Sequence, residues 1–343
     1  MTPRATLQEV AELAGVSRGT ASRALAGRGR VAESTRRRVR EAAESLSFAP
    51  NAVASNFRRA RTGTVGLWLP PDLRFMDYYM HFTFGVSEAL ADREVSLSLI
   101  AGSLRPQDVG RLAVDGFVMS DVVAGDPLAL AILESGRPVV TSEIVPDGMP
   151  SPAASVVTDH AGAMRVALDR LRAGGARSIV VLIPEIEQSW VAAARAGADA
   201  WARAAPMDVA FTMLSEMPVA ADLHAIVART LQATPDVDAI VCAADGIAIG
   251  VLTALHDLGR AVPDDVQLVS HVDSAAMPVV LPPIAATDLR PRDAGAAAGR
   301  LLLDALDALD DERPAGRPHP VVETLELRFH PRASVRAGDA GRR

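Results

Sequence analysis

Arginine and hydroxyl side chains cluster between positions 17 and 23, where they offer the most specific chemistry in this sequence. An arginine guanidinium can hold guanine through O6 and N7, or it can contact a phosphate. Ser17 stands where an N-cap residue precedes a helix. The residues of the cluster are Ser17, Arg18, Gly19, Thr20, Ser22 and Arg23. Arg18, Gly19, Ser22 and Arg23 would share one helix face, a surface suited to contacting nucleic acid.

Two short helices, expected over residues 7–14 and 17–26, would position this cluster, with Gly15 in the turn between them. Apolar side chains recur at the spacing that lets two helices pack together. Those expected in the seam are Val10, Ala11, Ala14, Val16 and Ala21. This leaves Arg18, Gly19, Ser22 and Arg23 on the outer face of the second helix, as a helix-turn-helix presents its reading helix to the major groove of DNA. The alternative is a solvated helical hairpin.

A third helix is expected over residues 31–46, where apolar side chains again have helical spacing. These side chains are Val39, Ala42, Ala43 and Leu46. Ala32 occupies the position before this helix, so a capping side chain is absent unless Ser34 supplies one a turn later. Pro50 disfavours helix at the residue before it. The short run 52–59 would form a helix only when paired with a copy of itself or laid on DNA.

Charge is unevenly distributed along the chain. Residues 1–62 hold twelve arginines and five glutamates, a net +7, whereas the whole chain of 343 residues carries −7. The rest of the chain therefore carries −14. A basic head on an acidic body is the electrostatic pattern of a nucleic-acid-binding domain joined to a separate domain.

Residues 6–57 resemble the DNA-binding head of the LacI-type (lactose and galactose repressor) family, through the runs TLQEVAELAGVSRGTASRAL, TRRRV and PNAVA. The resemblance implies that Arg18, Gly19 and Arg23 occupy base-reading positions. It implies that the positions which orient the protein on the DNA backbone are Leu7, Ser17, Thr20, Ser22 and Asn51. Because glycine has no side chain to read a base, we expect Arg18 to carry discrimination that Gly19 does not. A phosphate contact is the alternative for Arg18.

In this family a short hinge helix pairs across a dimer and inserts an apolar side chain into the minor groove. The resemblance places Ala54, Phe57 and Arg58 in that hinge as DNA contacts. Phe57 replaces the usual leucine, and an aromatic wedge can also unstack a base step and kink the duplex. The alternative is that Phe57 packs on the effector domain.

The remainder of the chain alternates short β-like runs with amphipathic helical stretches, a pattern typical of parallel sheets in an α/β body. The expected strands are 65–69, 95–100, 116–119, 138–141, 178–183, 239–244 and 266–270. The expected helices are 80–92, 127–135, 161–174, 189–204, 222–233 and 246–258. At this length the body should contain two lobes.

The same layout resembles the two-lobed, periplasmic-binding-protein-like effector domain of LacI-type regulators. The landmarks in order are VDGFVM, SVVTDHAGAM, ADGIAIGVLTALHDLGRAVPDDVQLVS, PPI and PRASV. The resemblance implies an N-lobe of about 63–158 plus 290–316 and a C-lobe of about 159–288 plus 320–334. It places a ligand in the cleft between them. The expected organisation is a helix-turn-helix domain (1–47), a hinge and linker (48–62), the body (63–334) and a tail (335–343).

The cleft is where this sequence departs from the family. Apolar residues replace planar polar side chains at several positions, among them Ala244, Val272, Ala285, Ala286 and Leu289. A buried sugar hydroxyl left without a partner costs about 1–3 kcal/mol, so we expect a small-molecule effector that is not a typical monosaccharide. The candidate contacts are Tyr78, Tyr79, Glu143, Trp190, Arg195, Asp245 and Asp273. Trp190 could instead belong to the core, and Asp245 could instead cap the helix at 246–258.

Motifs for catalysis, metal binding and export are absent from the sequence. No G-x-G-x-x-G follows a strand, and no P-loop or G-x-S-x-G frame occurs. The seven histidines have no metal-ligand spacing, and Cys242, the single cysteine, lies in an apolar run that predicts a buried thiol. The charged N-terminus does not suit a signal peptide. We therefore expect a cytoplasmic protein that is not an enzyme and has no metal or cofactor.

These features together predict a sequence-specific DNA-binding transcriptional regulator, a repressor whose operator affinity changes when a small molecule binds between the lobes. A homodimer should bind a double-stranded operator with two inverted half-sites. The tail lacks leucine heptads, so a coiled-coil tetramer is not expected. An effector-independent regulator or an activator with a vestigial cleft is the alternative. A solute-binding protein and an enzyme using the cleft fit the basic head and the missing catalytic motifs less well.

Overall fold

The computed structural model describes residues 5–25, 31–46, 48, 61–70, 77–205, 207–215, 220–310 and 321–337. The chain divides into two compact units, Met1–Gly63 and Thr64–Arg343. The two units are described separately below, the head first and the body second.

The described part of the head contains three helices: α1 (Leu7–Leu13), α2 (Arg18–Leu25) and α3 (Glu33–Ser45). A capping box begins α1, because the Thr6 side chain accepts from the Glu9 backbone while the Glu9 side chain accepts from the Thr6 backbone. Gly15 has φ of 64° in the turn before α2, a conformation that glycine adopts at little cost. The head core is Val10, Ala11, Ala14, Ala21, Ala24, Val39, Ala42 and Ala43, with Val16 and Leu46 packed against it. The predicted three-helix head is therefore confirmed.

Helix α3 begins without a capping side chain. Its N-cap is Ala32, which makes no side-chain hydrogen bond to the helix. Ser34 is the second residue of α3 and lies inside the helix, so it is not the N-cap residue. The first turn of α3 is therefore less stabilised than that of α1, which has a complete capping box.

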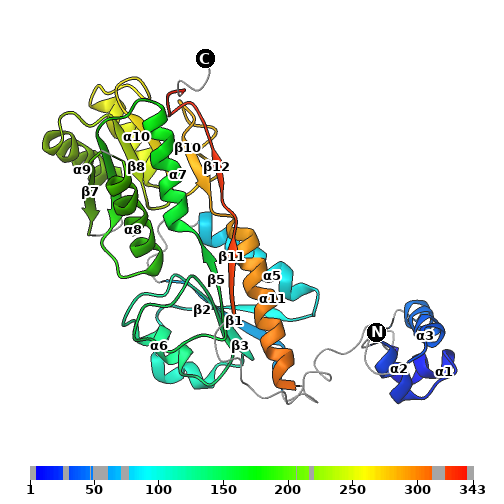
Figure 1. Cartoon of the computed structure of the whole chain (residues 1–343). Helices are drawn as coiled ribbons and strands as arrows, with labels where there is room; N and C mark the ends of the chain where they lie inside the picture. The colour runs from blue at the N-terminus through cyan, green and yellow to red at the C-terminus, as the bar shows by residue number, and fades with distance from the viewer. Residues whose placement is uncertain are drawn as a thin grey trace. The chain divides into compact units, whose positions relative to one another are not determined.

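The N-lobe of the body is a parallel sheet with helices on both faces (Figure 1). Its strand order is β11-β5-β4-β3-β1-β2. The strands are β1 (Thr64–Trp68), β2 (Ser96–Ile100), β3 (Gly116–Ser120), β4 (Val139–Ser142), β5 (Ala154–Thr158) and β11 (Val321–Leu325). Helices α5 (Asp77–Ala91) and α11 (Pro291–Asp310) cover one apolar core. The 3-10 helix η1 (Pro106–Arg111) and helix α6 (Pro127–Leu133) cover the other.

The C-lobe repeats this architecture, with strand order β12-β10-β9-β8-β6-β7. The strands are β6 (Ile179–Pro184), β7 (Val209–Leu214), β8 (Ala239–Cys242), β9 (Gln267–Ser270), β10 (Ala285–Asp288) and β12 (Arg328–His330). Only β12 runs antiparallel to its neighbour, β10. Helices α7 (His160–Ala173) and α8 (Ser189–Ala204) pack on one face, and α9 (Ala220–Ala233) and α10 (Ile247–Asp257) on the other. The predicted α/β body with two parallel-dominated sheets is therefore confirmed.

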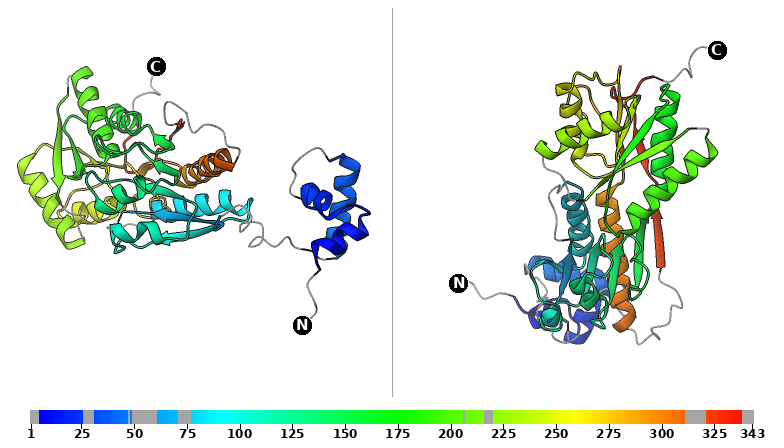
Figure 2. Two further views of the ribbon diagram at one scale, coloured as in Figure 1. Left: turned by 90° about the horizontal axis from the view of Figure 1, so that it is seen from below. Right: turned by 90° about the vertical axis from the view of Figure 1, so that its left-hand side faces the viewer.

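The chain passes between the lobes three times, and further views of the body are shown in Figure 2. The crossings follow β5, β10 and β11. Assigning all of 320–334 to the C-lobe was wrong, because β11 aligns in parallel with β5 of the N-lobe, with Val321 beside Ala154. The segment is long enough for one strand in each sheet, with residues 326–327 between them.

The start of the expected tail also differs from the structure. Val335 packs against the C-lobe core, and the Arg336 side chain donates to the carbonyl oxygens of Pro263 and Asp264. Residues 335–337 therefore belong to the C-lobe, whereas 338–343 lie outside the described residues. In the described part of the chain, no helix is long and apolar enough to cross a membrane.

Candidate functional site

The exposed face of α2 carries the predicted DNA-reading residues. Arg18, Gly19 and Arg23 are exposed. Ser17 caps the helix, because its Oγ accepts from the Thr20 backbone N–H at 3.1 Å and lies 2.9 Å from Thr20 Oγ1. Arg23 Nη2 reaches Thr20 Oγ1 at 3.5 Å, which leaves the rest of its guanidinium open to solvent. Helix α2 thus has a capped N-terminus and a buried inner face, and it presents Arg18 and Arg23 on its exposed face.

Two other predicted DNA contacts have different surroundings. Leu7 is half-buried and packs on the head core, and Ser22 is half-buried on α2. At Gly19 a Cβ would meet only Ser17 Oγ, at 3.9 Å, so packing does not explain the glycine. The remaining predicted contacts lie outside the described residues; they are Asn51, Ala54, Phe57 and Arg58.

A second candidate site lies between the two lobes, at the carboxyl ends of parallel strands. In open α/β sheets this is the edge where ligands bind. Asp121 directly follows β3, and Glu143 directly follows β4. Both have positive φ, 49° and 70°, which is uncommon for residues other than glycine. These backbone turns place two carboxylates, 7% and 4% exposed, at the same edge of the N-lobe sheet.

Among the described residues, His160 is the only basic side chain that acts on the Asp121 carboxylate. Its Oδ2 accepts from the Tyr79 hydroxyl at 2.8 Å and from Ser120 Oγ at 3.3 Å. Burial, and then repulsion by Glu143, raise the pKa of Asp121 to about 6, against the opposing effects of Tyr79 and His160. Burial and the adjacent Asp121 also raise the pKa of Tyr79 well above its usual range.

Three buried side chains form a chain of polar contacts from the N-lobe into the C-lobe. Glu143 Oε1 lies 3.3 Å from His160 Nε2, and His160 Nδ1 lies 3.0 Å from His271 Nε2. The Thr158 backbone N–H also donates to Glu143 Oε1, at 3.1 Å. Burial, and then the neighbouring His160, lower the pKa of His271 to about 3, so this ring is neutral at physiological pH.

Gln188 forms a second connection between the lobes. Its Nε2 donates to the Asp121 carbonyl at 2.7 Å, and its Oε1 accepts from Trp190 Nε1 at 2.6 Å. The Trp190 ring lies 5.8 Å from the His160 ring, centroid to centroid. A backbone bond from Ala124 to Glu187, 3.1 Å, reinforces this connection. Trp190 thus contacts the polar cluster with one edge and the C-lobe core with another.

Tyr78 and Asp245 complete the site from opposite lobes. The Tyr78 backbone N–H donates to Asp245 Oδ2 at 3.4 Å. Burial, and then Asp121 and Glu143, raise the pKa of the Tyr78 hydroxyl well above its usual range. Burial, together with the nearby Asp77, raises the pKa of Asp245 to about 6. Asp245 is not the N-cap of α10; that position is Gly246, in the left-handed conformation and without a side-chain cap.

The structure brings together five of the seven predicted effector contacts: Tyr78, Tyr79, Glu143, Trp190 and Asp245. It does not bring the other two to this cluster. Arg195 is exposed on α8, where its guanidinium lies 5.1 Å from the Phe211 ring centroid. Asp273 is held by Arg332 in a bidentate ion pair, with N–O distances of 2.8 and 2.7 Å.

Sequence reasoning missed four residues of this site: Asp121, His160, Gln188 and His271. Asp121 and His271 each follow a strand that was predicted. The rule that ligands bind at carboxyl strand ends could therefore have singled out both residues. Gln188 directly precedes α8 as its N-cap, yet its side chain makes no capping bond to the helix backbone and instead bonds to the Asp121 carbonyl and to the Trp190 side chain. That orientation had no signal in the sequence.

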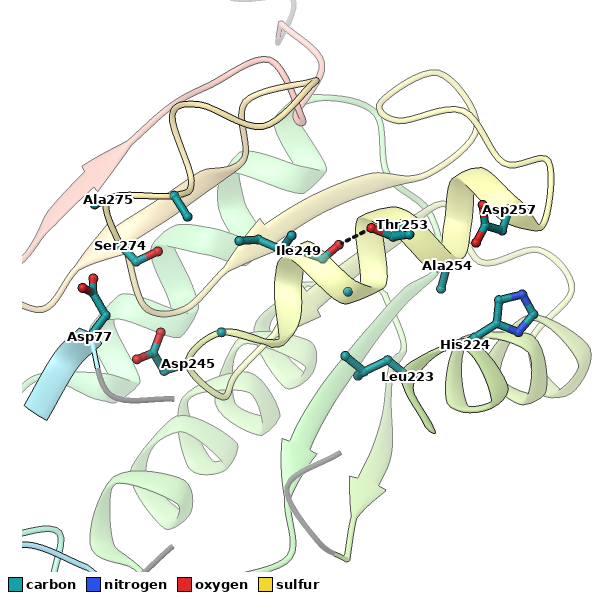
Figure 3. Close-up of a pocket in the computed structure, with 13 residues that line it drawn as sticks. Asp77, Leu223, His224, Asp245, Ile249, Thr253, Ala254, Asp257, Ser274 and Ala275 are labelled. Carbon is teal, nitrogen blue, oxygen red and sulfur yellow. Dashed lines mark hydrogen bonds between the residues drawn. The ribbon is translucent and has the colours of Figure 1, made fainter. Parts of the chain in front are cut away.

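A groove of about 660 Å³ runs beside Asp245 on the C-lobe. Its lining comes from α9, α10 and the segment 274–276, together with Asp77 of the N-lobe. Figure 3 shows Asp77 and Asp245 near one end of this groove and His224 and Asp257 near the other. Asp245 therefore contributes to both the interlobe cluster and the groove. Among the described residues, no group of three or more His, Cys, Asp or Glu side chains is placed to hold a metal ion.

Comparisons with known proteins cover both units. Residues 6–51 match the family described as bacterial regulatory proteins, lacI family, and 168–335 match a periplasmic binding protein-like domain. The HTH-type transcriptional regulator CelR of Thermobifida fusca is 32% identical over 313 residues, 88% of this chain and 92% of that protein. The regulator IpsA of Corynebacterium glutamicum is 28% identical over 359 residues, 96% of this chain and 97% of that protein.

Solved structures agree with this relationship. A CelR–cellobiose complex is 28% identical with a TM-score of 0.70, covering 96% of this chain and all (100%) of that one. The lac repressor dimer bound to operator and the anti-inducer ONPF is 20% identical with a TM-score of 0.69, covering 98% and 100%, and shows the shared fold. This chain belongs to the LacI family of bacterial transcriptional regulators, with a DNA-binding helix-turn-helix head and a periplasmic-binding-protein-like effector domain.

Proposed function

We propose that this protein is a homodimeric repressor that binds an inverted-repeat operator and changes its operator affinity when a small molecule occupies the interlobe site. The observation that carries this proposal is the direct bonding of the two lobes through Glu143 and His160, and through Gln188 and the Asp121 carbonyl. A ligand inserted among these groups must contact both lobes. It would therefore bind the open and closed arrangements with different affinity, which is the requirement for a ligand-driven switch.

The head supplies the proposed operator contacts. Arg18 and Arg23 project from α2 into solvent, supported by the buried seam with α1. We assign base discrimination chiefly to Arg18, because Gly19 offers no side chain. The hinge residues Asn51, Ala54, Phe57 and Arg58 are assigned to the centre of the operator by family resemblance.

Exposed apolar side chains support a dimer formed through the body. On the N-lobe, Met80 and Phe84 lie exposed on α5, and Leu99 is 65% exposed on β2, the edge strand that packs beside α5. On the C-lobe, Val279 and Leu281 are 76% and 88% exposed. Large apolar side chains at a bare sheet edge favour association with another chain.

The interlobe residues support an effector other than a typical monosaccharide. A CelR–cellobiose complex is known, so a relative of this protein binds a disaccharide. Ala285 and Ala286, which were expected in the cleft, belong to the two C-lobe cores. Val272 and Leu289 are buried apolar residues shortly after β9 and β10, at positions where the family commonly carries polar ones. A sugar hydroxyl facing them would lose its hydrogen-bond partner.

Selection of operators from random double-stranded DNA with the full-length protein tests the proposal. We expect enrichment of a sequence with two inverted half-sites, and a change in its affinity when the correct small molecule is added. Enrichment without any symmetric motif would contradict the dimeric operator contact. A selected operator whose affinity no compound changes, across a broad metabolite screen, would favour the effector-independent alternative.

The hinge assignment has its own test. Replacing Phe57 with Ala should weaken binding to the selected operator more than binding to random DNA, because insertion at the operator centre depends on a deformable base step. Equal losses on both duplexes would contradict insertion. Leu46→Ala, a change in the head core, serves as the control for general destabilisation.

A further inference from the structure

We infer that the interlobe site binds a positively charged ligand, a protonated amine, in preference to a neutral polyol or an anion. This inference rests on the proposed function, because it names the chemical class of the effector for the same site. It draws on three features of the described residues: carboxylates contributed by both lobes, the absence of an arginine paired with them, and buried polar atoms without a hydrogen-bond partner.

Three carboxylates from both lobes converge around one hydroxyl group. Asp121 accepts from the Tyr79 hydroxyl at 2.8 Å, and Asp245 accepts from the Tyr78 backbone N–H at 3.4 Å. Burial, and then Asp121, Glu143 and Asp245, raise the pKa of the Tyr78 hydroxyl. Asp121 and Glu143 come from adjacent N-lobe strands, whereas Asp245 follows the C-lobe strand β8. The potential at the Tyr78 hydroxyl is therefore negative from both sides of the site.

No arginine among the described residues forms an ion pair with any of these carboxylates. The chain contains no lysine, so arginine is its only strong base. Arg332 pairs with Asp273, and Arg195 lies over the Phe211 ring. Burial raises the pKa of Asp121 and that of Asp245 to about 6, and His160 offsets only part of this effect at Asp121. A cationic ligand would supply the missing charge.

Two buried polar atoms of the site have no hydrogen-bond partner among the described residues. His160 Nδ1 and His271 Nε2 share one hydrogen bond, whose direction depends on the tautomers of the two rings. His271 Nδ1 is buried and has no partner within the described part of the chain. The Ser142 hydroxyl, 1% exposed and beside that of Tyr78, also lacks a partner in hydrogen-bond geometry.

Aromatic rings flank the carboxylates in an arrangement that suits an organic cation. Tyr78 and Tyr79 meet edge to face, with ring centroids 5.4 Å apart. Trp190 lies on the C-lobe side, against His160. Ring faces attract an ammonium group, most strongly where water is excluded. An ammonium group carries three donors and no acceptor, so it can donate to these carboxylates and to the Ser142 hydroxyl oxygen.

Matched amine and alcohol probes test the inference with the full-length protein. The pairs are tyramine and tyrosol, putrescine and 1,4-butanediol, and glucosamine and glucose. Thermal shift and calorimetry at pH 7.5 should show at least one amine binding tenfold or more tighter than its alcohol. No amine preference in any pair, or binding only of anionic compounds, would overturn the inference.

Variants locate the effect and separate it from folding. Asp121→Asn and Glu143→Gln should each reduce the amine preference severalfold, whereas Asp92→Asn, an exposed carboxylate of the same lobe, should leave it unchanged. An amine preference that survives both site variants would place the amine elsewhere and overturn the inference. Operator binding by the same preparation without any probe tests the proposed function separately, so the two can fail independently.

The pH profile gives a second readout. Asp121 faces Glu143, Tyr79 and His160, and Asp245 faces Asp77. As the pH falls through about 6, these two aspartates lose the negative charge that attracts a cation, so affinity for the amine probe should fall. Affinity that is flat or that rises between pH 8 and pH 5 would contradict ionic recognition.

Discussion

Asp121 is the residue on which the interlobe site depends most. Its carbonyl accepts from Gln188 of the other lobe, its carboxylate accepts from Tyr79, and its φ of 49° turns both groups inward. A backbone in this region costs a non-glycine residue about 1 kcal/mol or more, and such costs concentrate at ligand sites. Asp121 thus contributes both to the contact between the lobes, through its carbonyl, and to the negative charge of the site, through its carboxylate.

Replacing Asp121 with Asn should stabilise the protein near neutral pH. The pKa of Asp121 rises from 3.8 to about 6 on folding, so the folded state disfavours its charged form. The free energy that the ionised Asp121 removes from folding is absent below pH 4 and grows as the pH rises from about 4 to about 6. Above that it is on the order of 1–3 kcal/mol. Urea unfolding at pH 7.5 should therefore show the variant to be more stable, with a difference that vanishes at pH 4. A loss of stability that is equal at both values would contradict this account.

Residue types predicted part of the interlobe site and missed the rest for a physical reason. Glu143 and Trp190 stood at positions suggested by the family pattern, and the structure places both in the cluster. Asp121 and Gln188 matter through backbone conformation and contact across lobes, which depend on how two sheets meet. The periodicity of apolar residues within one helix or strand cannot predict how the two sheets pack against each other.

At the scale of elements, helix α3 is the weakest-capped part of the head. Ala32 has φ of −59° and ψ of 142° and no side-chain cap. Ala32→Ser should stabilise the head by about 1 kcal/mol, because a serine oxygen can accept from a free backbone N–H of the first turn. The denaturation midpoint of the head transition measures this gain. Ala32→Val, which has no capping oxygen, is the control and should give none.

Helices α5 and α11 approach each other through glycines. A Cβ at Gly85 would overlap the Arg292 carbonyl oxygen, and one at Gly295 would overlap that of Phe82. Gly85→Ala should therefore destabilise the N-lobe by about 1–3 kcal/mol, because backbone and not a mobile side chain would have to shift. Gly110→Ala, where a Cβ meets nothing within 4 Å, should change little. Equal effects in chemical denaturation would contradict the close packing.

The central strands of both sheets were easier to predict from the sequence than the strands at or near the sheet edges. Buried strands such as β6 and β8 are continuous apolar runs, which the sequence displays directly. The short strands β10 and β12 and the half-exposed β7 were not singled out. Such strands are defined by their neighbours more than by their own composition. The same dependence explains why β11 was assigned to the wrong lobe.

At the scale of the whole molecule, the proposed dimer should depend on exposed apolar side chains of both lobes. Leu99→Arg combined with Leu281→Arg would place charge where apolar contact is proposed. Light scattering after size-exclusion chromatography should show the double variant as a monomer and the wild type as a dimer. Arg substitution at Leu309, exposed on α11, is the control and should leave the dimer intact. An unchanged dimer in the double variant would place the interface elsewhere.

The most direct test of the central claim compares operator and scrambled DNA for the wild type and Arg18→Ala. At about 150 mM salt, where non-specific phosphate contacts are screened, fluorescence anisotropy should show the wild type preferring the selected operator by about 10³-fold or more. Arg18→Ala should lose about 1–3 kcal/mol on the operator and little on the scrambled duplex. Equal affinity of the wild type for both duplexes would contradict sequence-specific regulation by this head.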